Sequence, residues 1–279
     1  MWKNRYSKYR HHRIWFERWI TEGYTLRQVA QQSGHSLSTI RRIITYWLVR
    51  PPTLADDLST VHFMIFDGTF LEHRTGVFAV MNAEHNNVVY AEPHASEGRT
   101  EMQRVCQALA RRAAAPKSAT TDGNLHLLRA LRHQWSPIVI QRCLVHVQRQ
   151  GLSWCRRFPK RTDAKHLRTL FLRVTNIGSI AERDEFLDHV HAWERRFGLR
   201  IAQSPETGWV FSDLKRARSM LLAALPDMFR YLDDTHIPRT TNALEGYFGR
   251  LKQRYRQHRG LARHNRDAYF RWYVHLCPR

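Results

Sequence analysis

The chain has 279 residues, 43% of them hydrophobic, which suffices for one large domain or two to three small ones with buried cores. Lysine and arginine (45 residues) outnumber aspartate and glutamate (24 residues), which gives a net charge of +21 and a pI of about 10.7. Because the cations run along the whole chain, the composition excludes an ordinary near-neutral enzyme and indicates a polyanionic partner, nucleic acid above all.

Targeting and redox signals are missing from the sequence. No apolar run reaches the roughly 18 residues of a membrane-spanning helix, and the basic first residues do not resemble a signal peptide. The four cysteines are scattered, so neither a disulfide framework nor a zinc ribbon is supported, and we expect no zinc. We expect a cytoplasmic, nucleoid-associated protein with reduced thiols that does not bind membranes.

The first 22 residues are a basic arm in which aromatic residues such as Trp2 and Trp15 alternate with cations. This composition suits phosphate contacts combined with aromatic packing. The alternative is a frayed terminus followed by a short helix, residues 14–20, that packs on the next segment.

The next segment has the spacing of a helix-turn-helix. The pattern predicts one helix at Leu26–Gln32 and a second that begins at Ser36 or Ser38. Thr25 and Ser36 are typical N-cap residues, and Gly34 lies where the turn requires a positive φ.

Four polar side chains on the second predicted helix face outward, where they can reach base edges and phosphates of double-stranded DNA. They are Ser38, Thr39, Arg41 and Arg42. The alternative is a plain pair of packed helices. We predict a DNA-binding domain at residues 1–50 and a linker at residues 51–60, where Pro51-Pro52 ends the preceding helix.

After the linker, the pattern predicts strands and helices in the order β-β-β-α-β-α-β. The first apolar run, residues 61–66, predicts a buried strand that ends at Asp67-Gly68. The other predicted elements are strands at residues 76–82 and 88–93, a helix at 100–112, a strand at 118–121, a helix at 125–134 and a strand at 137–140. Residues 147–235 are then predicted to form helices separated by glycine and proline residues.

Three acids are the candidate catalytic residues: Asp67, Asp122 and Glu245. The two aspartates each follow a predicted strand and precede a glycine, although a lone Asp-Gly at a strand end is most often only a turn. If the three carboxylates converge, they supply the hard oxygen ligands that Mg²⁺ prefers.

Glu245 lies on a predicted amphipathic helix, Thr240–Arg256, on the same side as Asn242 and Lys252. The apolar side of this helix consists of Leu244, Phe248, Leu251 and Tyr255. A single acid among so many cations indicates a metal ion or a phosphate nearby. The alternative is an ordinary solvated acid on a surface helix.

Cys143 and His146 lie three residues apart at a predicted helix start and so share one face. A zinc site needs two further ligands, and no second pair is evident. We favour a packing or orienting role beside the acids over metal ligation, and a phosphate contact by His146 stays open.

Four motifs carry a resemblance to a known family: FDGTF at Asp67, TTDGN at Asp122, CLVH at Cys143 and TTNALEGYFGRLK at Glu245. Residues 60–255 resemble the DDE transposases of bacterial insertion sequences and of eukaryotic Mutator-like elements. The resemblance implies an α/β (α+β) fold with an RNase H-like mixed sheet, interrupted by an all-helical insertion and preceded by the helix-turn-helix domain.

The resemblance also implies the roles of the site residues. Asp67, Asp122 and Glu245 are expected to bind two Mg²⁺ or Mn²⁺ ions per active site. Asn242, Lys252 and Arg256 are expected to contact DNA. The core would comprise residues 61–146 and 236–279, with the insertion at residues 147–235 between them.

The function we expect is a transposase that binds the terminal inverted repeats of its element, nicks the DNA and joins 3′ ends to target DNA. Two ends must be brought together, so we expect a homodimer or a larger oligomer on DNA. Three alternatives stay open: a domesticated DNA-binding protein that does not cut, a metal-dependent nuclease specific for branched DNA, and a basic nucleic-acid chaperone without an active site.

Overall fold

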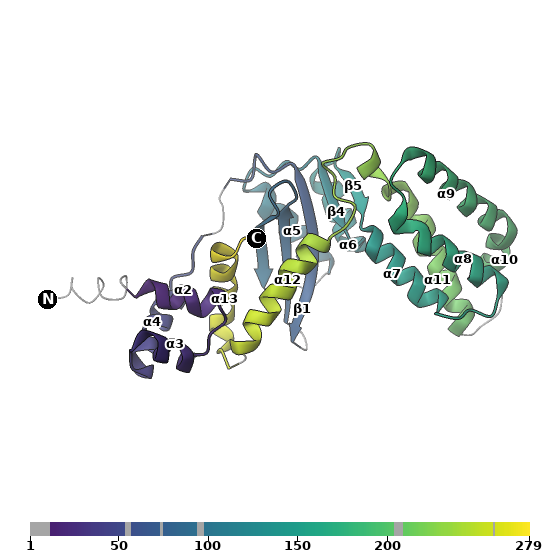
Figure 1. Cartoon of the computed structure of the whole chain (residues 1–279). Helices are drawn as coiled ribbons and strands as arrows, with labels where there is room; N and C mark the ends of the chain where they lie inside the picture. Colours follow the sequence, from purple (N-terminus) through teal and green to yellow (C-terminus); the bar gives the residue numbers. More distant parts are fainter. Residues whose placement is uncertain (1–11, 54–56, 73–74, 94–97, 204–208, 259) are drawn as a thin grey trace. The chain divides into compact units, whose positions relative to one another are not determined.

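The computed structural model describes residues 12–53, 57–72, 75–93, 98–203, 209–258 and 260–279 (Figure 1). It is a mixed α/β structure with a five-stranded sheet. The chain forms two compact units, one of residues 1–62, 66–115 and 242–279 and the other of residues 63–65 and 116–241. Residues 1–11 of the predicted basic arm lie outside the described residues. The predicted domain boundaries stay a prediction.

The sheet has the strand order β3-β2-β1-β4-β5. The strands are β1 (Phe63–Glu72), β2 (Thr75–Asn82), β3 (Asn87–Pro93), β4 (Ser118–Thr121) and β5 (Val139–Arg142). β2 pairs with β3 in antiparallel register, whereas β4 pairs with β5 in parallel. The predicted order of strands and helices and the mixed character of the sheet are therefore confirmed.

The first strand is longer than predicted. The prediction of a strand at residues 61–66 that ends at Asp67-Gly68 is wrong, because β1 continues to Glu72. Gly68 continues the extended backbone here, so the Asp-Gly pair makes no turn. The fifth strand is shifted as well, since β5 begins at Val139 and not at Pro137. Proline has no amide hydrogen to donate to a sheet.

The described helices of the first unit are α2 (Arg13–Thr21), α3 (Leu26–Ser33), α4 (Leu37–Leu48), α5 (Arg99–Ala110), α12 (Asn242–Tyr255) and α13 (Arg263–Leu276). The start of α3 is the predicted residue, and α2, α4, α5 and α12 begin within two residues of the predicted start. Thr25 and Gln28 form a capping box at the start of α3, and Ser36 caps α4. Gly34 between these two helices has a φ of +68°, as the turn requires.

Aromatic side chains hold the N-terminal helices against α13. Phe16 of α2 packs edge-on against Trp272 of α13, with ring centroids 5.0 Å apart. The indole nitrogen of Trp272 donates a hydrogen bond to the carbonyl oxygen of Trp47 in α4. Trp19 packs against Tyr269 in the same way, at 5.6 Å. Three helices thus share one aromatic core.

The apolar side of α12 is buried as predicted. Leu244, Phe248, Leu251 and Tyr255 are all almost fully covered. Tyr247 is buried too, which the predicted stripe did not include, and its ring lies 5.7 Å from that of Tyr273 in α13. Burial on this side fixes the rotation of α12 about its axis, and with it the side on which Glu245 projects.

The second unit is mainly helical, and helices make up most of the described part of residues 147–235, as predicted. Its helices are α6 (Leu125–Gln134), α7 (Leu144–Cys155), α8 (Thr162–Arg173), α9 (Ile180–Trp193), α10 (Leu199–Gln203) and α11 (Trp209–Ala224). Gly151 of α7 allows close packing, because a Cβ there would lie 2.3 Å from the ring of Phe171 in α8. Gln141 of β5 is buried and donates a hydrogen bond to the carbonyl oxygen of Met228.

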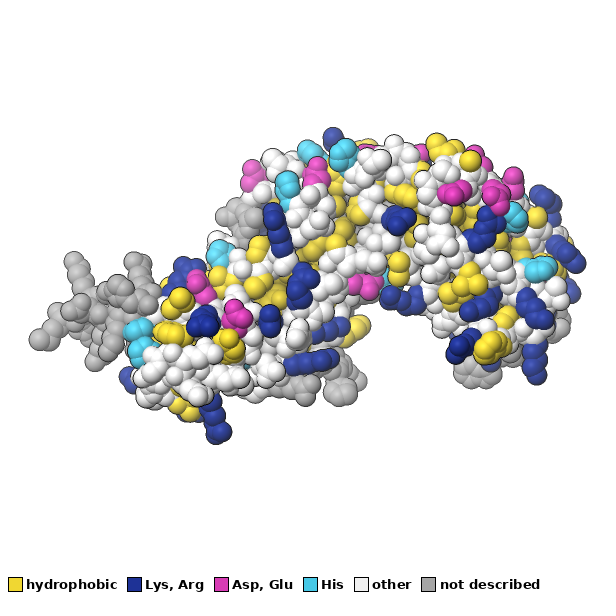
Figure 2. Space-filling model, in the orientation of Figure 1, with side chains coloured by type: hydrophobic (Ala, Val, Ile, Leu, Met, Phe, Trp, Pro, Cys, Tyr) yellow, Lys and Arg dark blue, Asp and Glu magenta, His cyan; other side chains and the backbone are white. Residues whose placement is uncertain are grey.

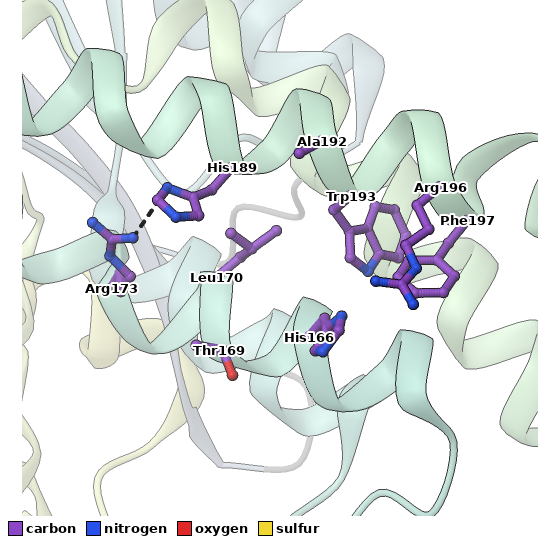
Figure 3. Close-up of a pocket in the computed structure, with 9 residues that line it drawn as sticks. All are labelled: His166, Thr169, Leu170, Arg173, His189, Ala192, Trp193, Arg196 and Phe197. Carbon is purple, nitrogen blue, oxygen red and sulfur yellow. Dashed lines mark hydrogen bonds between the residues drawn. The ribbon is translucent and has the colours of Figure 1, made fainter.

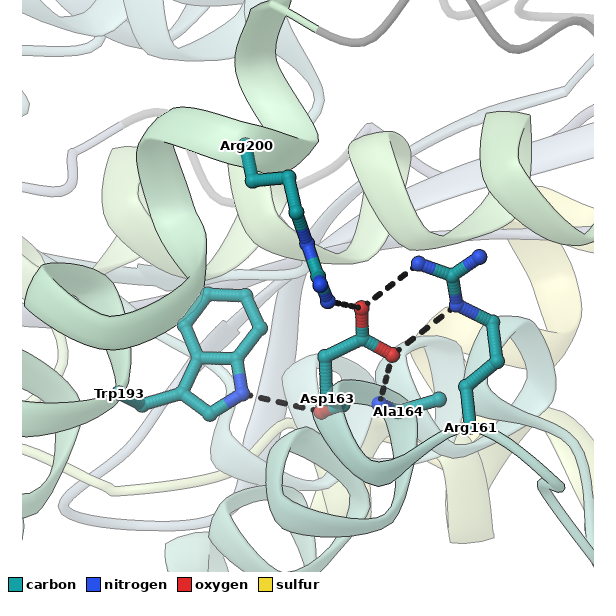
Figure 4. Close-up of polar contacts among 5 residues, drawn as sticks. All are labelled: Arg161, Asp163, Ala164, Trp193 and Arg200. Atoms are coloured by element: carbon teal, nitrogen blue, oxygen red, sulfur yellow. Dashed lines mark hydrogen bonds and ion pairs between the residues drawn. The ribbon is translucent and has the colours of Figure 1, made fainter.

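A buried carboxylate joins two helices of this unit (Figure 4). Asp163 in the first turn of α8 is 1% exposed and accepts hydrogen bonds from Arg161, from Arg200 of α10 and from the amide of Ala164. The indole nitrogen of Trp193 donates to the carbonyl oxygen of the same residue. Burial raises the pKa of Asp163, but these hydrogen bonds outweigh it and hold the pKa below its ordinary value.

Asp163→Asn is expected to lower the free energy of unfolding by about 2 kcal/mol at pH 7, because charge-assisted hydrogen bonds are lost. A carboxyl whose pKa is lower in the folded state stabilises the protein above its unfolded pKa and loses this effect as the pH falls. The difference from wild type should therefore shrink below about pH 4. Urea denaturation followed by circular dichroism measures it. Asp188→Asn, at an exposed position of α9, is the control and should change little.

Candidate active site

Asp67 lies within β1, and only 8% of its surface is exposed. Its Oδ1 accepts a 2.8 Å hydrogen bond from the amide of Gly68. Because the strand backbone fixes the carboxylate, its position is well defined, as a metal ligand requires.

Asp122 directly follows β4, as predicted. Its Oδ1 accepts hydrogen bonds from the amide of Asn124 at 2.9 Å and from the hydroxyl of Thr121 at 3.2 Å. Asn124 in turn caps α6 with its own side chain. Asp122 therefore lies at the carboxyl end of a parallel strand, where ligands of α/β sheets commonly bind.

The turn after Asp122 requires glycine. Gly123 has a φ of +97°, and a Cβ at this position would lie 2.0 Å from the guanidinium carbon of Arg142. Arg142, at the end of β5, donates a 3.1 Å hydrogen bond to the carbonyl oxygen of Asp122. Burial lowers the pKa of Arg142, and the charge of Asp122 opposes this change. A buried cation thus supports the backbone of this candidate ligand, a role that the sequence did not suggest.

Cys143 and His146 contact the residue that precedes α12. The amide of Thr241 donates a hydrogen bond to Sγ of Cys143 at 3.3 Å, and its hydroxyl lies 3.5 Å from the same sulfur. That hydroxyl is also 3.4 Å from Nδ1 of His146. Burial raises the pKa of the Cys143 thiol, but hydrogen bonds with His146 and Thr241 outweigh it and lower the pKa. Both Cys143 and Thr241 are fully buried.

The main chain strengthens this attachment. The hydroxyl of Thr120 in β4 donates to the carbonyl oxygen of Pro238 at 2.7 Å. The amide of Leu144, the first residue of α7, donates to the carbonyl oxygen of Arg239 at 3.0 Å. We call residues 238–241 the anchor segment. Its contacts with β4 and with the C-x-x-H motif favour the packing or orienting role of Cys143 and His146.

Glu245 lies in the first turn of α12 and is half-buried. An acid in this position is stabilised by the helix dipole. Asn242 is exposed, Lys252 is half-buried, and Arg256 is exposed just beyond the helix end. The helix is continuous from Asn242 to Tyr255, so the spacing keeps Asn242, Glu245 and Lys252 on one side.

The three candidate acids belong to both compact units. Asp67 and Glu245 are in the first unit and Asp122 is in the second. Within the described residues, no group of three histidine, cysteine, aspartate or glutamate side chains lies together as a metal site. A three-acid metal site therefore stays a prediction. The carboxylate donors present are of the class that Mg²⁺ prefers.

The candidate DNA-binding residues of α4 are accessible. Ser38, Arg41 and Arg42 are exposed and Thr39 is half-buried. The opposite side of the helix buries Ile40, Ile43, Ile44 and Leu48. The exposed side chains of α4 are therefore polar or cationic. On the face shown in Figure 2, lysine and arginine side chains recur in both units.

A pocket of about 360 Å³ lies between α8 and α9 (Figure 3). Trp193, Phe197 and Leu170 provide apolar walls, and two histidines and two arginines complete the lining. Arg173 already has partners within the protein: it donates a hydrogen bond to Glu185 at 2.7 Å and lies 3.3 Å from Nδ1 of His189. The pocket is thus less cationic than its lining suggests.

No protein-family model matches the chain, and no curated protein is significantly similar to it. Among the helices that the structure describes, none has the length and apolar character needed to traverse a bilayer. All four cysteines are free thiols.

Proposed function

We propose that the chain is a DDE transposase, a metal-dependent enzyme that cleaves DNA strands and joins 3′ ends to target DNA. One observation carries this proposal. The anchor segment, whose last two residues begin the TTN motif, contacts both Cys143 and His146 of the C-x-x-H motif and also β4, the strand that Asp122 follows. The start of the TTN motif, the C-x-x-H motif and the strand that precedes Asp122, which are distant in sequence, thus lie in one compact unit.

The fold class supports the same proposal. A mixed sheet in the order β3-β2-β1-β4-β5, followed by a helical segment between β5 and α12, agrees with the RNase H-like core and helical insertion that the resemblance implies. Neither feature identifies a family by itself, because one fold supports many functions.

In the proposed site, Asp67, Asp122 and Glu245 are the ligands of two Mg²⁺ or Mn²⁺ ions. Such ions stabilise the attacking and leaving oxygens of an in-line phosphoryl displacement. The protein supplies the positions of the carboxylates: β1 fixes Asp67, the turn supported by Arg142 fixes Asp122, and the anchor segment precedes Glu245 by four residues.

DNA binding is assigned to two regions in this proposal. The α3–α4 pair acts as a helix-turn-helix that recognises the terminal repeats, with base and phosphate contacts from α4. Its candidate residues are Ser38, Thr39, Arg41 and Arg42. Asn242, Lys252 and Arg256 contact DNA near the scissile phosphate. Two copies of the chain hold the two DNA ends together. The protein acts in the cytoplasm, in association with the nucleoid.

The second candidate is a DNA-binding protein of transposase origin that does not cut. The finding that favours it is that no three-ligand metal group occurs among the described residues. The metal dependence of cleavage separates the two functions.

We expect the purified chain to nick a supercoiled plasmid that carries the DNA flanking its own gene, in Mg²⁺ or Mn²⁺ but not in EDTA. Carboxylate sites depend on the bound ion for charge stabilisation, so removal of the metal should leave DNA binding intact and eliminate nicking. Gel electrophoresis measures nicking and fluorescence anisotropy measures binding. Binding without nicking in either metal would support the second candidate, and nicking in EDTA would contradict the metal-dependent mechanism.

A further inference from the structure

The loop between α7 and α8 presents an aromatic ring to solvent. Phe158 is 82% exposed, more than any other large apolar side chain of the described residues. A single exposed apolar residue is ordinary on a protein surface. The surroundings of Phe158 distinguish it, because the loop sequence Arg156–Arg161 has four cations in six residues.

Two of these cations are available to a ligand. The guanidinium of Arg157 lies 5.3 Å from the centroid of the Phe158 ring, which places a positive charge against an aromatic face. Within the described residues, neither Arg157 nor Lys160 has an acidic partner. The tip of the loop is therefore a flat aromatic group between two unneutralised charges.

Contacts of Arg156 and Arg161 hold the two ends of the loop in place. Arg156 has a φ of +62°, and its carbonyl oxygen accepts a 2.9 Å hydrogen bond from Arg168 of α8. Arg161 at the other end forms an ion pair of 2.9 Å with Asp163, which Arg200 also contacts (Figure 4). A non-glycine residue at positive φ, such as Arg156, marks a locally constrained backbone.

We propose that the Arg156–Arg161 loop is a DNA-contacting surface, in which Arg157 and Lys160 contact backbone phosphates and Phe158 stacks on an unpaired or partly unstacked base. This inference rests on the proposed function, because it takes DNA as the partner. Stacking on an aromatic ring tolerates any base, and flanking cations neutralise the phosphates. Loop ends that are already fixed reduce the entropy lost on binding.

The experiment compares the full-length protein with Phe158→Ala and with the double variant Arg157→Ala/Lys160→Ala. Fluorescence anisotropy measures their affinities for a fully paired duplex and for the same duplex with a short single-stranded gap. Phe158→Ala is expected to weaken binding to gapped DNA by about 5- to 100-fold and to change binding to paired duplex less. The double variant should reduce the slope of log affinity against log salt by about 1.5.

Ile180→Ala is the matched control, because Ile180 is 54% exposed in the same unit. It should bind both DNAs as wild type does. Circular dichroism checks that every variant is folded. A photoreactive phenylalanine analogue at position 158 is expected to crosslink to gapped DNA.

Equal affinities of Phe158→Ala and wild type for gapped DNA would overturn the stacking role. An unchanged salt slope in the double variant would overturn the phosphate contacts. Crosslinking only to another protein chain would overturn the DNA assignment of the loop. Each of these results leaves metal-dependent nicking by the same preparation unaffected, so failure of the loop proposal is distinguishable from failure of the proposed function.

Discussion

Asp122→Asn is expected to abolish Mg²⁺-dependent nicking while DNA binding stays at the wild-type level. An amide has almost the same shape as a carboxylate but lacks its charge, so it binds Mg²⁺ poorly. Loss of one electrostatic stabiliser commonly reduces the rate by about 100- to 1,000-fold, and loss of a metal ligand should cost at least as much. Plasmid nicking and anisotropy, measured on one preparation, give both quantities.

The matched control for Asp122→Asn is Asp188→Asn, the same substitution at an exposed position of α9. It should leave nicking and binding unchanged. In the Asp122 variant, the backbone amide of Asn124 donates to an amide oxygen in place of a carboxylate oxygen. Circular dichroism checks that the fold is unchanged. Nicking by Asp122→Asn at the wild-type rate would show that this aspartate is not a ligand and that the site is wrongly assigned.

Thr241→Val is expected to reduce nicking by about 10- to 100-fold without weakening DNA binding, the range found when partners of metal ligands are removed. Valine has nearly the shape of threonine but lacks the hydroxyl that contacts Cys143 and His146. Loss of these two contacts loosens the end of the anchor segment, four residues before Glu245 in the first turn of α12. A displaced ligand should also raise the Mg²⁺ concentration needed for half-maximal nicking.

Two comparisons separate positioning from general destabilisation. Thr241→Ser retains the hydroxyl and should restore most of the activity and the metal dependence. Thr235→Val makes the same change at an exposed position and should behave as wild type. If Thr241→Val nicks at the wild-type rate with unchanged Mg²⁺ dependence, the anchor segment has no positioning role.

The secondary structure was largely predictable because it depends on local patterns. The residues of β4 and α6 agree with prediction at both ends, and the N-caps of α3 and α4 are the predicted Thr25 and Ser36. Capping and turn chemistry involve neighbours in sequence, so they are visible without a structure.

The support of the candidate site was not predictable. Arg142 approaches Gly123 from another strand, and Thr241 meets Cys143 across 98 residues of sequence. Such contacts depend on tertiary packing, which the spacing of hydrophobic residues along the sequence does not reveal. The extension of β1 through Asp67-Gly68 has the same origin, because pairing within a sheet overrides a local preference for a turn.

The hydrogen bond between Leu144 and Arg239 has an evolutionary consequence. It places the first residue of α7 beside Arg239, so the helical segment between Leu144 and Arg239 begins and ends at the same point of the structure. Lengthening a segment whose two ends are held together adds little entropic cost, about 0.6 kcal/mol for each doubling of its length. Helices can therefore be gained, lost or exchanged within this segment while β1 and β4, which position Asp67 and Asp122, stay in place.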